Sequence, residues 1–310
     1  MLNIIGKRYW FFALSALIII PGMIILAIWG LPFSIDFTGG NRLEVQFPSG
    51  KIPDTARVYQ IYTNMGINDP QVVTSGNDGL SITTSPLTQE QGSMALAAIE
   101  TLAGEKVVVL QESNVGPVIG QELTSRALMT LGLTSLALVL FITFSFRGVE
   151  NAFHYGIATI VALVHDVLII FSIFAIGGRI WGWQLDTLFL TALLTVIAFS
   201  SQDTIVVFDR MRENSNIFRR LDFETLLNHS VVQTLGRSIN TQLMTVDFLL
   251  LSLALFGGVT LKQFAITLIV GMISGSYSSI FIAAPFLVIW KKKEWRNWFR
   301  RNGQSQPVAS

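Results

Sequence analysis

Charged residues and cysteine are what this sequence has least of. Its 310 residues include no cysteine, and only 13% are charged, whereas about 25% is usual for a soluble domain. The absence of cysteine excludes disulfide frameworks, thiolate metal sites and cysteine nucleophiles. A net charge of +1 gives no basis for nucleic-acid binding. With 51% hydrophobic residues, the chain is predicted to be a membrane protein with some soluble material attached.

Motifs for hydrolytic or cofactor-dependent chemistry are missing as well. The three histidines, His154, His165 and His229, are too scattered in the sequence to suggest a metal motif. No nucleotide-binding loop, nucleophile–base pair or metal-ligand spacing is present. The sequence therefore predicts neither an enzyme nor a cofactor or metal site.

Long apolar runs predict a bundle of transmembrane helices. The first run exceeds a signal-peptide core of about 7–15 residues and no cleavage motif follows it, so we expect a retained span, kinked at Pro21. Six spans would place both termini on one side of the membrane, and we find no internal repeat among them. The predicted spans are 9–30, 124–146, 152–176, 185–208, 239–257 and 263–290.

Residues 31–122 differ in character, because turn residues separate short apolar runs. Four segments are strand-like, two have helical spacing, and their order is β-α-β-β-α-β. This order predicts a small α+β ferredoxin-like domain between the first span and the bundle 123–290. The strand candidates are "RLEVQF" (42–47), "QVVTS" (71–75), "LSITTS" (80–85) and "KVVVLQES" (106–113), and the helix candidates are 54–65 and 88–104.

Lysine and arginine are unevenly distributed between the two sides of the predicted spans. The positive-inside rule assigns the richer side to the cytoplasm. We therefore expect residues 1–30 to comprise a cytoplasmic amino terminus and the first span. The loop 209–238 and the basic tail 291–310 are also expected in the cytoplasm, and the 31–122 domain outside. The richer side carries Lys7, Arg8, Arg147, Arg210, Arg212, Arg219, Arg220, Arg237 and the tail, and the poorer side carries Arg126, Arg179 and Lys262.

An acidic residue, Asp203, interrupts the fourth predicted span. It precedes Asp209 by six residues, or about 9 Å of helix, which places it well inside the hydrocarbon. A charge there costs at least about 2.5–3.5 kcal/mol, so the group must be protonated, paired with a cation or exposed to water. Each of these outcomes makes Asp203 a titratable switch. The alternative is a carboxylate that only joins helices through hydrogen bonds.

Further polar residues in the spans indicate a proton or ion relay. His165 and Asp166 lie near the middle of the third span. Arg237, Asn240 and Asp247 follow one another at helical spacing, so they are expected to share one face. We expect these residues to converge with Asp203 inside the bundle. The candidate coupling residues are Asp203, Arg237, His165, Asp166 and Asp247, and the supporting polar residues are Ser200, Ser201, Gln202 and Asn240.

Simpler interpretations of the individual residues stay open. Arg237 can be an interfacial positive-inside residue, His165 can bond a neighbouring backbone, and Asp247 can be solvated near the outer surface.

In the last span, Gly271 and Gly275 form a G-x-x-x-G spacing. Small residues allow close contact between helices, so this stripe predicts helix packing. The packing residues are Gly271, Ser274, Gly275 and Ser278.

Six segments of the chain carry a recognisable pattern: "SIDFTGG" (34–40), "VGPVIGQEL" (115–123), "HDV" (165–167), "SSQDTIVVFDRMREN" (200–214), "GRSINTQ" (236–242) and "GSYSSIFIAAPFLV" (275–288). Together they resemble the SecF family of protein-translocation accessory subunits, and they cover most of the chain in the family's order. One segment departs from the family pattern, since Ala198, Phe199 and Gln202 stand where the family usually has Gly, Tyr and Asn, although the acid is retained.

The resemblance implies membership of the resistance–nodulation–division superfamily and a place in the bacterial cytoplasmic (inner) membrane. It implies a complex with SecD, which supplies a related six-helix half, and with the SecYEG channel. Proton motive force would then drive late steps of preprotein movement, with Asp203 and Arg237 as functional residues. The external domain would grip the emerging preprotein.

Two other functions are compatible with the same residues. The chain could be half of a small-solute exporter of that superfamily, or a non-transporting scaffold of the channel. Six spans without an internal repeat imply a partner under each of these interpretations.

Overall fold

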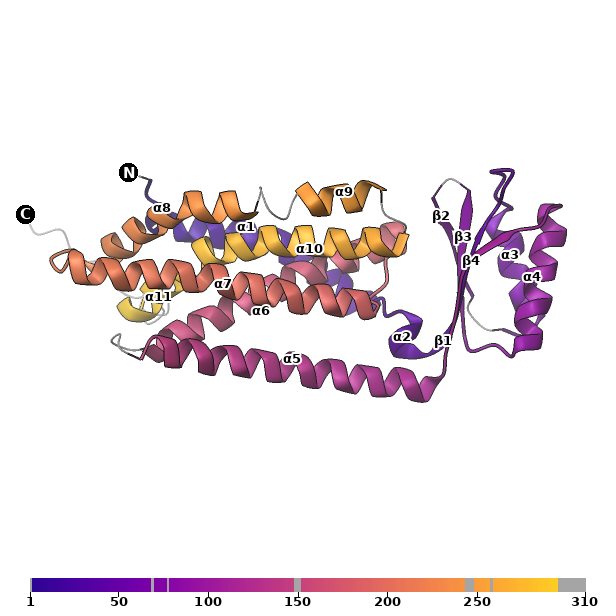
Figure 1. The fold of residues 1–310 in the computed structure, drawn as a ribbon, viewed down its shortest axis with the longest axis horizontal. Coiled ribbons are helices and arrows are strands. Elements are labelled where there is room, and N and C mark those ends of the chain that lie inside the picture. The colour runs from indigo at the N-terminus through magenta and orange to yellow at the C-terminus, as the bar shows by residue number, and fades with distance from the viewer. Residues whose placement is uncertain are drawn as a thin grey trace, which may run out of the picture.

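The computed structural model describes residues 2–67, 70–76, 78–147, 152–242, 248–256 and 259–294. A bundle of long helices adjoins, at one end, a four-stranded sheet that carries two helices (Figure 1). The amino terminus and the end of α11 lie at the other end of the bundle. The molecule is therefore elongated, with its α+β module at one tip.

Five helical segments of the described residues are long and apolar enough to cross a membrane. They match the predicted spans except 239–257. The first helix, α1, continues on both sides of Pro21. The five segments are α1 (Arg8–Trp29), α5 (Pro117–Ser145), α6 (Ala152–Trp181), α7 (Thr187–Ile217), and α10 (Val259–Ser278) joined to α11 (Ala284–Lys292) by a π-helical turn, Ser279–Ala283.

The predicted span 239–257 coincides with the end of α8 (Phe223–Gln242), with α9 (Phe248–Phe256) and with residues 243–247, which lie outside the described residues. The α9 helix alone, at 9 residues, is shorter than the roughly 20 residues that a membrane span needs. The described structure therefore supports five spans, and the sixth stays a prediction.

The expected loop 209–238 is mostly helical. The α7 helix continues to Ile217 and α8 begins at Phe223, so only a short segment joins them. Ion pairs at i,i+3 spacing, from Arg212 to Asp209 (2.6 Å) and from Arg210 to Glu213 (2.6 Å), follow the polar end of α7. Such pairs support a solvated helix, so the helix does not end where the apolar run ends.

The module has the predicted order of elements. Its sheet order is β2-β3-β1-β4, with every neighbouring pair antiparallel. Val45, Leu80 and Ile82 from the sheet pack with Val58 and Ile99 from the helices, which cover the face turned away from the bundle (Figure 1). The elements are β1 (Gly40–Gln46), α3 (Thr55–Asn64), β2 (Gln71–Ser75), β3 (Gly79–Thr84), α4 (Gln89–Ala103) and β4 (Val108–Val115).

Glycines allow two pairs of bundle helices to approach closely. A Cβ atom at Gly22 of α1 would lie 2.1 Å from Cβ of Ser172 in α6. A Cβ atom at Gly271 of α10 would lie 2.2 Å from a methyl group of Val196 in α7. Gly271, which belongs to the predicted G-x-x-x-G stripe, thus lies where α10 and α7 approach closely. Backbones in direct contact gain dispersion energy, which drives helix association where lipid removes the hydrophobic effect.

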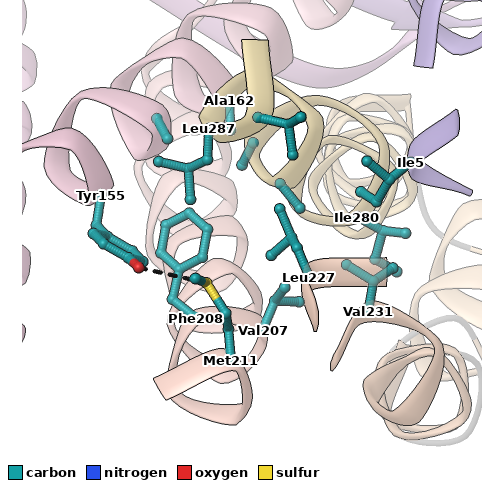
Figure 2. Packing of buried hydrophobic residues seen from close by; sticks show 14 of the residues in the cluster. Ile5, Tyr155, Ala162, Val207, Phe208, Met211, Leu227, Val231, Ile280 and Leu287 are labelled. Atoms are coloured by element: carbon teal, nitrogen blue, oxygen red, sulfur yellow. Dashed lines mark hydrogen bonds between the residues drawn. The ribbon is translucent and has the colours of Figure 1, made fainter. Parts of the chain in front are cut away.

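An apolar cluster holds α8 on the bundle at the end near the termini (Figure 2). Phe208 and Met211 of α7 meet Leu227 and Val231 of α8 there. The hydroxyl of Tyr155 in α6 points to the sulfur of Met211, at 3.5 Å. This cluster fixes the position of α8, whose far end reaches the candidate site.

Ion pairs at the same end join three segments that are distant in sequence. Arg8 at the start of α1 donates to Glu224 of α8 (2.9 Å) and to Glu294 after α11 (2.6 Å). Lys292 also pairs with Glu224, and the Tyr9 hydroxyl donates to Glu294 (2.9 Å). Arg8 is only 8% exposed, so these carboxylates neutralise a buried cation.

Replacement of Glu224 by alanine is expected to destabilise the protein by about 1–3 kcal/mol, since charge-assisted hydrogen bonds to Arg8 and Lys292 are lost. The hydrogen bond and charge of Lys292, together with those of Arg8, hold the pKa of Glu224 below its usual range. A lowered pKa contributes stability above about pH 4.3, the unfolded value, and the contribution disappears as pH falls through the folded pKa.

Thermal unfolding of the detergent-solubilised protein at several pH values measures this effect. The difference between wild type and Glu224→Ala should shrink as the medium is acidified. Glu213→Ala is the control, because the Glu213 side chain is 57% exposed and its pair with Arg210 contributes little. Equal melting temperatures for wild type and Glu224→Ala at neutral pH would contradict the prediction.

Candidate functional site

Asp203 lies on α7 among polar side chains from two other helices. Asp203 is only 8% exposed, and within the described part of the chain it has no charged partner. One carboxylate oxygen, Oδ2, accepts hydrogen bonds from Gln242 Nε2 of α8 (3.0 Å) and from Ser276 Oγ of α10 (2.8 Å). Movement of either helix therefore changes the solvation of this acid.

Asp166 of α6 occupies a second, more enclosed position. It is 1% exposed and both of its carboxylate oxygens are occupied. Oδ1 accepts from Ser274 (2.7 Å), and Oδ2 accepts from Ser200 (2.6 Å) and Ser278 (2.8 Å). Three hydroxyl donors compensate part of the cost of burying the acid.

His165 connects this second acid to α1. Its Nδ1 lies 3.2 Å from Oδ1 of Asp166, and its Nε2 lies 2.9 Å from Oγ of Ser15. The imidazole stacks on the ring of Tyr277, whose hydroxyl donates to the backbone oxygen of Phe11 (2.7 Å). The histidine therefore bonds side chains, which differs from the simple backbone partner considered from the sequence.

The serines of α10 alternate between the two acids. Ser274 and Ser278 bond Asp166, whereas Ser276 bonds Asp203. Because the helix turns about 100° per residue, positions two apart face opposite sides, and α10 thus contacts both acids. A π-helical turn follows directly at Ser279–Ala283, and such turns are frequent at functional sites.

The α7 helix carries one of the acids, Asp203, and bonds the other, Asp166. Ser200 bonds Asp166 and lies three residues before Asp203, so the two residues are on neighbouring parts of one helix face. Ser279 of the π-helical turn contacts the hydroxyl of Thr204 at 2.8 Å and donates to the backbone oxygen of Ser200 at 3.2 Å. Hydroxyl groups of α7 and α10 thus surround Asp166, whereas Asp203 has separate partners, Ser276 and Gln242.

The remaining predicted residues are distributed differently. Ser201 bonds the backbone oxygen of Ile197 (2.7 Å), and Gln202 is exposed. Arg237 and Asn240 are exposed on α8, where Gln242 is the residue that reaches Asp203. Arg237 lines a cleft of about 420 Å³ between α7 and α8, together with Asp209. Asp247, predicted to share the relay, lies outside the described residues.

The direct partners of Asp203, Ser276 and Gln242, were not predicted from the sequence. Ser276 belongs to the serine-rich run "SGSYSS" (274–279), in which no residue stands out from the others. Gln242 ends the segment 236–242, in which Arg237 was the predicted functional residue. Ser274 and Ser278 were assigned to packing, but here they also bond Asp166. A run of hydroxyl residues inside an apolar span was the available signal. Among the described residues, no group of three or more histidine, aspartate or glutamate side chains could hold a metal ion.

The chain resembles known proteins both in sequence and in structure. Residues 95–293 match the family model "Protein export membrane protein SecD/SecF, C-terminal", and residues 24–47 match the "SecD/SecF GG Motif". The protein translocase subunit SecF of Anaerolinea thermophila is 55% identical over 304 residues, which cover 98% of this chain and 99% of that protein. SecF of Thermobaculum terrenum is 43% identical over the whole chain.

Longer proteins named SecDF match as well. The SecDF translocase subunit of Bacillus subtilis is 33% identical over 93% of this chain, but the match covers only 38% of that protein. The crystal structure of SecDF from Thermus thermophilus, a translocon-associated membrane protein, superposes with a TM-score of 0.83 at 28% identity, covering 94% of this chain and 39% of that one. The chain thus spans about two fifths of the SecDF proteins it matches.

Proposed function

Because the chain belongs to the SecD/SecF family of protein-export membrane proteins, we propose that it serves as the SecF half of a proton-driven accessory to the Sec translocase. The observation that carries this proposal is the 55% identity to a SecF over nearly the full length of both chains. The chain is a multi-pass membrane protein by its family and its apolar helices. We place it in the bacterial inner membrane with cytoplasmic termini, because lysine and arginine concentrate on that side.

SecD is the proposed partner. In the longer SecDF chains, more than half of the length has no counterpart here. Thr191 and Gln202 on α7 and Asn240 on α8 are exposed at the surface of the bundle. Polar groups that face lipid are costly, so a second half covering these helices stabilises the assembly. A sixth span over 239–257, predicted from the sequence, remains part of this proposal.

Asp203 is the proposed proton-coupling residue. A proton that moves through 100 mV releases about 2.3 kcal/mol, enough to shift a two-state equilibrium by roughly 50-fold. While ionised, Asp203 retains the bonds from Ser276 and Gln242; once protonated, it holds α8 and α10 less strongly. Arg237 and Asp247 would complete the relay in the state where the cleft beside Arg237 admits the proton.

The module is the proposed preprotein-binding arm. Its element order and its sheet order β2-β3-β1-β4 support a ferredoxin-like classification. The strand β4 lies at one edge of the sheet and exposes Val108, Val109 and Leu110. An exposed edge strand accepts an extended polypeptide by strand addition, which fits an unfolded preprotein leaving SecYEG.

Translocation assays test the function. In inverted vesicles from cells that lack their own SecF, this chain with SecD should co-purify with SecYEG and restore the stimulation of preprotein translocation by proton motive force. Equal support after a protonophore collapses the force would favour the scaffold. Export of a small solute, with translocation unaffected by loss of the chain, would favour the half-exporter.

A further inference from the structure

The segment that follows α1 is hydrogen-bonded to the start of α7. The backbone N–H of Ser34 donates to Leu185 O (2.9 Å), and Leu185 N–H donates to Pro32 O (2.7 Å). Oδ2 of Asp36 then accepts from both the backbone N–H (2.9 Å) and the hydroxyl (3.0 Å) of Thr187, the first residue of α7. A carboxylate at this position also interacts favourably with the helix dipole.

Asp36 also belongs to the segment that leads into the module. It lies in the one-turn helix α2 (Ile35–Thr38), which leads through Gly39 and Gly40 directly into β1. Both glycines have positive φ angles (+76° and +147°), and a Cβ atom at Gly40 would lie 2.5 Å from the backbone oxygen of Thr84 in β3. Only glycine fits here, so α2 and the sheet form one closely packed unit.

The covalent chain does not connect α7 directly to the module. The chain enters the module from α1 and leaves it into α5. The α7 helix reaches the module through Asp36 and through Gln184, which bonds Arg42 and donates to Gln71 (3.2 Å). Asp36 bonds α7 itself, whereas Gln184 belongs to the preceding loop.

The same helix carries the proton-coupling acid. Asp203 follows Thr187 by 16 residues, or about 24 Å along one continuous helix. A continuous helix packed against its neighbours over this length moves as a nearly rigid element, so a displacement caused at Asp203 reaches Thr187. Resting on the proposed function, we propose that Asp36 is a positioning residue that couples α7 to the module and transmits the protonation-driven motion to the preprotein-binding arm.

A loss of translocation while proton flux continues distinguishes this role from a purely structural one. In vesicles that contain the full complex with SecD and SecYEG, Asp36→Ala should lower proton-motive-force-stimulated translocation by at least about fivefold, the lower end of typical coupling effects. Proton flux should continue, because Asp203 keeps its partners. Asp54→Ala is the matched control, since Asp54 caps α3 inside the module by accepting from Ala56 N–H (3.0 Å). It should translocate like wild type.

Crosslinking supplies a second test, because the chain has no cysteine of its own. In the Asp36→Cys, Thr187→Cys double variant, a short thiol-specific crosslinker should restore translocation relative to the unlinked protein. The inference is wrong if Asp36→Ala matches Asp54→Ala, if its proton flux falls in parallel with translocation, or if linked and unlinked double variants are equal. If Asp203→Asn retains wild-type translocation, the proposed proton-coupling role of Asp203 fails instead.

Discussion

Replacement of Asp203 by asparagine is expected to reduce translocation to the level seen without proton motive force, a loss of up to roughly 50-fold in the driven component. Asparagine has the size of the acid, and its carbonyl oxygen can still accept from Ser276 or Gln242. It cannot take up or release a proton between pH 5 and 8. The effect therefore isolates titration from packing.

The measurement compares translocation and proton flux in vesicles with and without a potential. Asp209→Asn is the matched control, since Asp209 lies on the same helix, is exposed and pairs with Arg212 (2.6 Å). It should behave as wild type. If Asp203→Asn retains wild-type flux and stimulation, the carboxylate serves only to join α7, α8 and α10.

The variant Gly22→Val should show a large loss of stability in the bundle. The added Cβ atom would lie 2.1 Å from Cβ and 2.5 Å from Cα of Ser172, so backbone must move. Overpacking of this kind typically costs about 1–3 kcal/mol. The separation of α1 from α6 should also break the contact between Ser15 and His165.

Thermal unfolding in detergent, followed by size-exclusion chromatography, tests this prediction. Gly132→Val in α5 is the control, because a Cβ atom at Gly132 meets no atom within 4 Å. Both variants introduce the same β-branched residue into a membrane helix. A melting temperature for Gly22→Val equal to that of Gly132→Val would show that α1 and α6 do not depend on this close approach.

Much of the architecture could be predicted from local patterns. Five apolar runs became helices where their length and composition indicated, because a bilayer leaves the backbone few alternatives to a helix. The module's element order followed from short alternating runs and from turn residues. The loop 209–238 was less predictable, since charged helices that continue beyond the membrane resemble loops in composition.

The candidate site was only partly predictable. Asp203 and Asp166 were identifiable, because an acid within an apolar run is visible in the sequence itself and is costly unless it has a partner. Their partners were not, since helical spacing groups Arg237 with Asn240 but does not say which face of α8 meets α7. The structure exposes that face and turns Gln242 inward.

Local hydrophobicity and periodicity specify which acids lie within apolar runs, where five of the six predicted spans lie and in which order the elements of the module follow, so these features could be predicted from the chain alone. The hydroxyl groups that solvate each acid, and the bond between Asp36 and Thr187 across 151 residues of sequence, are visible only in the folded molecule. Such contacts depend on how whole helices rotate and approach, which is set by packing of the complete bundle and is not encoded in any single segment.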